Sequence, residues 1–150
     1  MKLNTAPLQE IEYGMPVLAE GTYFGKIDNS KVALKPQKGG AGNNLIVPVT
    51  IISTDLLTFD GKPVENRGQI KLTQYVSLVK TENYNPDQRL KEIAVACLVP
   101  AEKEDFEISD IRGYIKVKVA YNKPQGQFGD SNSIARFLPI KDSDNFNPPS

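Results

Sequence analysis

Residues 114–121 read YIKVKVAY, the most regular alternation of apolar and polar side chains in the chain. Isoleucine and valine alternate with lysine, and this period of two is typical of a β-strand with one buried face and one wet face. If the aliphatic side chains face the core, Tyr114, Lys116 and Lys118 lie together on the outer side. The stretch therefore predicts a strand whose exposed surface carries an aromatic ring and two positive charges.

The segments around this stretch give the order strand, strand, strand, helix, strand, strand. Residues 86–98 have apolar side chains at the i, i+3, i+4 and i+7 spacing of a helix, with Asn85 as the expected cap. A Gly/Lys-rich loop joins the first two strands and a Gly-rich loop joins the last two. The other expected strands are 22–34, with a bend or bulge at Gly25, and 45–52, 69–79 and 133–140. Asp60-Gly61 is the strongest hairpin-turn signal in the polar connection 53–68. This order predicts an all-β fold with one helix, a five-stranded Greek-key barrel of the oligonucleotide-binding (OB) type with the helix between strands 3 and 4.

The domain organisation follows from the same pattern. Residues 1–19 show little periodicity and are expected to form an N-terminal arm, and 20–140 form one domain. Residues 141–150 are expected to be a flexible C-terminal tail.

The composition argues against several classes of protein. The 150-residue chain has one cysteine and no histidine, so an internal disulfide cannot form, and a structural zinc site and the usual general base are not expected. No clustered Asp/Glu pattern indicates a carboxylate site for Mg²⁺, so no cofactor or metal is expected and the protein is predicted not to be an enzyme. No signal peptide and no apolar run near the length of a membrane span is evident, which favours the cytoplasm and no contact with membranes.

Charge is balanced overall but unevenly distributed. The formal net charge is zero, with 18 basic and 18 acidic residues. Residues 101–111 carry five acidic residues and one lysine, whereas 112–123 carry four basic residues and no acidic one. Such segregation can produce a basic face on a neutral protein.

Several short sequences, in their order and spacing, resemble a known family. The chain reads EGTY at 20–23, GGAGNNL at 39–45, ISDIRGYIKVKV at 108–119 and NSIARFLP at 132–139. Over about residues 19–140 it is similar to the single-stranded DNA-binding proteins encoded in bacteriophage replication modules. The resemblance implies an OB fold and a non-enzymatic, largely sequence-independent binder of single-stranded DNA in replication or recombination, acting in the host bacterial cytoplasm. Because IRGYIKVKV departs from the family's commoner Leu-Gly strand opening, binding residues are chosen here by their chemistry.

Binding an unpaired strand requires cations for the phosphates and aromatic faces for the bases. The candidates combine both kinds of side chain on the expected strands and loops. They are Phe24, Lys26, Lys35, Lys38, Lys71, Tyr75, Tyr114, Lys116, Lys118, Lys123, Phe128 and Arg136. For each there is a plainer alternative: lysines that only solvate a wet strand, a loop that is only a hairpin tip, or an aromatic ring that folds back into the core.

The tail has an acidic-plus-aromatic end, with Asp142, Asp144 and Phe146. Many single-strand binders carry acidic tails with a bulky apolar residue, which recruit replication proteins and compete with DNA; the alternative is a solvated terminus. A homodimer is possible, with the doubly apolar strand 45–52 as an interface. A second class of function, a protein–protein interaction module on an OB-like barrel such as a virion component or an inhibitor of a host factor, is favoured by the zero net charge and the acidic 101–111 segment.

Overall fold

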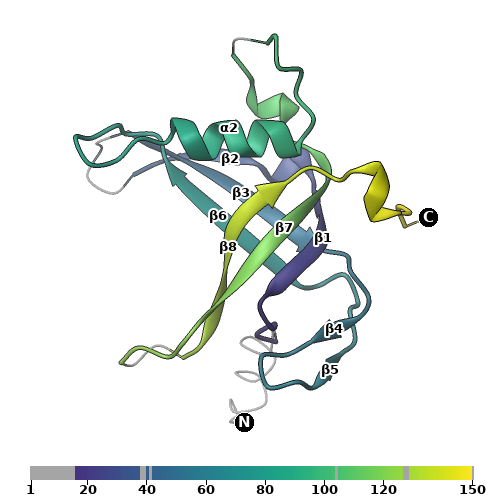
Figure 1. The fold of residues 1–150 in the computed structure, drawn as a ribbon. Helices are drawn as coiled ribbons and strands as arrows, with labels where there is room; N and C mark the ends of the chain where they lie inside the picture. The colour runs from purple at the N-terminus through teal and green to yellow at the C-terminus, as the bar shows by residue number, and fades with distance from the viewer. Residues whose placement is uncertain (1–15, 38–39, 41, 104, 127–128, 150) are drawn as a thin grey trace, which may run out of the picture.

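A computed structural model describes residues 16–37, 40, 42–103, 105–126 and 129–149 of the chain. Within these residues the protein is mostly β-sheet with one α-helix, which confirms that part of the prediction (Figure 1). The strands are β1 (Gly21–Ile27), β2 (Ala33–Pro36), β3 (Asn43–Ile51), β4 (Leu56–Leu57), β5 (Pro63–Val64), β6 (Lys71–Ser77), β7 (Gly113–Asn122) and β8 (Ser131–Leu138). The α-helix is α2 (Asp87–Ala96), and the 3-10 turns are η1 (Asn29–Lys31), η2 (Ile108–Asp110) and η3 (Asp142–Asp144).

The main sheet is antiparallel throughout. Its strands lie in the order β2-β3-β1-β7-β8, and β6 pairs with the other side of β3. Helix α2 lies between β6 and β7 in the chain, as expected. Strands β4 and β5 form a separate hairpin, whose turn at Asp60-Gly61 is the one the sequence predicts, with Gly61 at a φ of 84°.

The sheet does not close into a barrel by hydrogen bonding. Strands β6 and β8 are in contact, but no backbone ladder joins them in the described part of the chain. Helix α2 packs against β8 instead, across the end of the sheet (Figure 1). The closed five-stranded barrel that the sequence predicts is therefore not confirmed.

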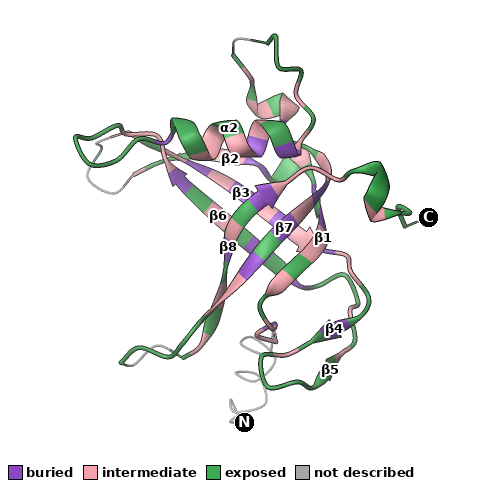
Figure 2. Ribbon diagram, viewed as in Figure 1, coloured by how far each residue is buried: buried purple, intermediate pink, exposed green. Residues whose placement is uncertain are grey.

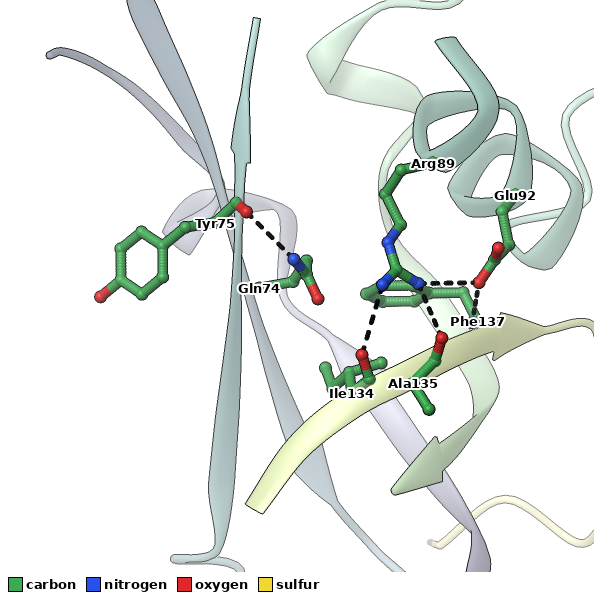
Figure 3. A network of polar contacts seen from close by, with 7 residues as sticks. All are labelled: Gln74, Tyr75, Arg89, Glu92, Ile134, Ala135 and Phe137. Atoms are coloured by element: carbon green, nitrogen blue, oxygen red, sulfur yellow. Dashed lines mark hydrogen bonds and ion pairs between the residues drawn. The ribbon is translucent and has the colours of Figure 1, made fainter. Parts of the chain in front are cut away.

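Side chains of α2 form hydrogen bonds with backbone groups at the free edge of β8 (Figure 3). Arg89 donates from Nη1 to the carbonyl of Ala135 at 3.0 Å and from Nη2 to that of Ile134 at 3.5 Å. Glu92 accepts from the backbone N–H of Phe137 at 2.5 Å and pairs with Arg89 at 3.0 Å. These charged groups therefore satisfy two carbonyls and one N–H at the edge of β8 in place of a neighbouring strand.

The facing edge of β6 is capped in a similar way. The side-chain amide of Gln74 donates to the carbonyl of Tyr75 at 3.0 Å. In Figure 3 Gln74 points into the gap toward Arg89, whereas the ring of Tyr75 points away from it. Polar side chains of α2 and β6 thus lie where backbone hydrogen bonds would join β6 to β8 in a closed barrel.

The long first strand expected over 22–34 is broken in the structure. Asp28 accepts a hydrogen bond from the N–H of Ser30 at 3.0 Å and starts the 3-10 turn η1. β1 therefore pairs with β7 and the end of β3, whereas β2 pairs with the start of β3. Pro48 lies on β3 between the stretch that pairs with β2 and the stretch that pairs with β1. Among the described residues no strand pairs with β3 on that side at Pro48, so the missing N–H of proline costs no ladder hydrogen bond.

The core lies between the inner face of the sheet and α2 (Figure 2). The alternation of β7 is confirmed, since Ile115, Val117 and Val119 are buried. Leu18 is also fully buried, and its backbone exchanges two hydrogen bonds with the side chain of Asn132, at 2.7 and 2.9 Å. The end of the expected N-terminal arm is thus part of the packed domain, and residues 1–15 lie outside the described residues.

Gly25 lies in the middle of β1, where this strand pairs with both β3 and β7. A Cβ at this position would lie 2.6 Å from Cγ1 of Val49. The absence of a side chain is therefore what lets β1 lie directly on β3. The sequence predicts a bend or bulge at Gly25, whereas the structure shows a regular strand in which glycine is required by the close approach of Val49.

Replacing Gly25 with alanine should destabilise the fold by about 1–3 kcal/mol, because Val49 is branched close to its backbone and cannot move away freely. Chemical denaturation measures the change. Gly21→Ala is the matched control in the same strand, because a Cβ there meets the Tyr23 side chain at 3.5 Å or more, an ordinary contact. Equal stability of the two variants would contradict the close approach.

Candidate nucleic-acid interface

The register of the sheet decides which side chains share a surface. Residues directly opposite one another in an antiparallel pair point to the same side. β1 and β7 oppose aromatic and cationic residues along most of their length. The pairs are Thr22 with Lys118, Phe24 with Lys116, and Lys26 with Tyr114.

The other strands extend this surface. Arg136 on β8 lies opposite Lys118, and Lys26 lies opposite Thr50, which in turn opposes Lys71 on β6. Further along, Tyr75 opposes Ile46, and Lys35 on β2 opposes Asn44. We call this side of the sheet the outer face. Its candidate binding residues are Phe24, Lys26, Lys35, Lys71, Tyr75, Tyr114, Lys116, Lys118 and Arg136.

Nine of the sequence-selected residues thus come together on one face. Tyr75 is its most exposed aromatic side chain, at 63%. Lys123 follows β7 and is exposed in the next loop. Lys38 and Phe128 lie outside the described residues.

The outer face is cationic in spite of the zero net charge of the chain. At the outward positions of β1, β2, β3, β6, β7 and β8 the charged side chains are lysine or arginine, and none is an aspartate or glutamate. The acids lie in the loops, the helix and the tail. Such a one-sided arrangement gives the face a positive potential of the kind that attracts polyanions.

The tail lies on this face. The ring of Phe146 stands 4.7 Å from that of Phe24 and 5.3 Å from that of Tyr114, centroid to centroid, in tilted geometry. Lys26 holds its Nζ 5.4 Å from the centre of the Tyr114 ring. Phe146 is therefore held by two aromatic rings of the outer face, with a cation beside them.

A carboxylate of the same tail pairs with a lysine of the same face. Asp144 lies 3.0 Å from Nζ of Lys116, whose side chain is only 17% exposed. Asp144 also accepts the backbone N–H of Lys141 at 2.7 Å. That hydrogen bond first, and the one from Lys116 second, lower the pKa of Asp144 below its ordinary value.

These contacts define what the outer face accepts. An aromatic ring lies against Phe24 and Tyr114, and an anionic oxygen lies on Lys116. A nucleotide offers the same two groups, a flat base and a charged phosphate oxygen. Sequence reasoning noted both Asp144 and Phe146 but could not decide between a tail that acts and one that is only solvated.

A second exposed feature lies on the far side of α2. A groove of about 950 Å³ runs between the helix and residues 98–103 and 105–106, with Val95 and Leu98 exposed at its edge. Leu98 is 69% exposed and has a φ of 59°, which is unusual for a residue with a branched side chain. The helix expected over 86–98 ends at Ala96, so Leu98 lies beyond its apolar stripe and is exposed.

No group of three or more His, Cys, Asp or Glu side chains within the described residues is arranged to hold a metal ion. No helix in that part of the chain combines the length and the apolar character needed to span a bilayer. No protein-family model matches the chain, and no curated protein matches it.

Asp144→Asn should release the tail, because it removes the charge that Lys116 holds. The ring-current shifts of Phe146 in aromatic NMR spectra would then move toward those of a free phenylalanine. Acid should do the same. The hydrogen bond from the N–H of Lys141 first, and the one from Lys116 second, lower the pKa of Asp144, so the contribution of Asp144 is complete above the ordinary aspartate range and is lost as the pH falls through the lowered value.

Asp142→Asn is the matched control, since Asp142 is exposed and has no ion pair among the described residues. Unchanged Phe146 shifts in Asp144→Asn would mean that the ion pair does not hold the tail.

Proposed function

We propose that this chain binds single-stranded DNA on its outer face, largely independently of base sequence and without catalysing a reaction. The observation that carries the proposal is the tail itself, which lays a ring and a carboxylate on Phe24, Tyr114 and Lys116. A strand of DNA would replace the ring with a base and the carboxylate with a phosphate.

The cations supply the sequence-independent part of binding. Lys26, Lys116 and Lys118 lie on neighbouring strands and would neutralise successive phosphates, with release of counterions. Bases would stack on Phe24, Tyr114 and the exposed Tyr75, each worth about 1–3 kcal/mol. Every base has a flat face, so stacking tolerates all sequences.

On this account the tail and DNA exclude each other at Phe24 and Lys116. Phe24, Tyr114 and Lys116 hold the tail on the outer face, so a strand that also reaches Lys118 and Arg136 would make more contacts and displace it. The released acidic tail would then be available to a replication protein.

We further propose that the fold is an OB barrel whose last ladder is left open. The chain order supports this: a broken first strand, two antiparallel strands, a helix and a final hairpin follow the OB sequence of elements. A phage replication module, the bacterial cytoplasm and a homodimer stay predictions.

A second candidate function is protein binding. It is favoured by the groove along α2, where Val95 and Leu98 expose apolar side chains. Titration with oligonucleotides separates the two candidates, because a module of this second class would not bind DNA in a salt-dependent way.

Lys118→Glu tests the proposal directly. It should weaken binding of labelled oligo-dT and of mixed-sequence oligonucleotides alike, by about tenfold at low salt, and lower the slope of log affinity against log salt by about one. Fluorescence polarisation between about 50 and 200 mM salt measures both quantities.

Lys91→Glu provides the control, because Lys91 is exposed on the groove side of α2 and carries the same change of charge. Binding that is absent, indifferent to salt, or weakened equally by the two substitutions would refute the proposed function.

A further inference from the structure

A hollow of about 530 Å³ opens beside the Phe24 ring. One wall is β1, the second is the segment 52–55 that follows β3, and the third is the tail around Phe146. If the tail leaves, the hollow becomes continuous with the position that the Phe146 ring now fills. A base stacked on Phe24 at that position would lie beside the segment 52–55, which lines the same hollow.

The segment 52–55 is held in place by hydrogen bonds. Ile52 donates to the carbonyl of Phe24 at 2.9 Å, and the N–H of Phe24 donates to Oγ of Ser53 at 2.8 Å. The amide of Asn66 donates to the carbonyls of Ile51 and Ser53, both at 2.8 Å. The wall is thus ordered before any ligand arrives.

The polar side chains of the segment 52–55 differ in whether they can donate or accept further hydrogen bonds. Ser53 already accepts a hydrogen bond, so its hydroxyl proton is free to be donated. Asp55 is exposed, lines the hollow and has no partner among the residues described. An ionised carboxylate only accepts hydrogen bonds.

A carboxylate at this point also discriminates against a phosphate. Phosphates are drawn to Lys116 and Lys118 on β7, whereas Asp55 repels them from the hollow. A strand on the outer face would therefore turn a base toward Asp55 and keep its backbone over the lysines.

We propose that this hollow is a base-reading subsite, in which Asp55 accepts hydrogen bonds from the amino and ring N–H groups of a nucleobase. The inference rests on the proposed function and adds a preference at one nucleotide to otherwise sequence-independent binding. Guanine presents two adjacent donors, N1–H and N2–H, that match a carboxylate. Cytosine and adenine present one amino group each, and thymine presents a single N–H between two carbonyl oxygens that repel Asp55. The expected order is guanine first and thymine last.

The experiment compares oligo-dT with an oligo-dT that carries isolated guanines, in a lithium buffer that prevents quadruplexes, on the full chain. Wild-type protein should bind the guanine-containing strand about five- to tenfold more tightly. Asp55→Asn should bring this ratio close to one, because an amide can also donate to thymine. Glu102→Gln removes one exposed carboxylate outside the hollow and should leave the ratio unchanged.

The outcomes separate the two proposals. Tight, salt-dependent binding with equal affinity for both strands would overturn the base-reading subsite and leave the proposed function standing. A guanine preference that survives in Asp55→Asn would also overturn the subsite at Asp55. No binding of either strand at low salt would overturn the proposed function, and the subsite with it.

Discussion

The antiparallel register between β1 and β7 fixes both faces of this sheet at once. On the inner side it buries Gly25 and Ile27 beside Ile115, with Gly25 close against Val49. On the outer side the same register brings Phe24 opposite Lys116. A slip of one residue would turn every side chain to the other face, so core packing and the composition of the outer face cannot change independently. The arrangement of rings and cations is therefore a consequence of how the core packs.

Local patterns in the sequence were enough to predict the elements but not how the sheet ends. The alternation in 114–121, the helix near 86–98 and the Asp60-Gly61 turn depend on neighbours in the chain, and all three are confirmed. The open edge of β8 depends on Arg89 and Glu92, far away in sequence, which satisfy its backbone in place of a strand. No periodic pattern in the sequence indicates that side chains replace a neighbouring strand at this edge. The break at Asp28 was missed because the flanking residues read as one continuous strand.

In the candidate site, too, features set by neighbours in the chain were predicted and features set by distant residues were not. Alternation along each strand predicted which lysines and aromatic residues point outward, and the pairing of strands then gathered them on one face. The docking of Asp144 and Phe146 could not be predicted, because it joins a tail without periodicity to a surface made by several strands. Asp55 and Asn66 were missed for a related reason: they lie in the long connection after β3, where their roles come from hydrogen bonds to other segments. The tail is nonetheless the most informative part of the site, since it presents the outer face with both chemical groups of a nucleotide.

Backbone-amide NMR during titration with oligo-dT tests the central claim most directly, because it locates the bound strand and follows the tail in one experiment. Binding at the outer face predicts the largest shift changes along β1 and β7, together with movement of the 142–147 signals toward random-coil positions as the tail leaves. Changes confined to α2 and residues 98–106, or tail signals that stay in place while the strand binds, would contradict it.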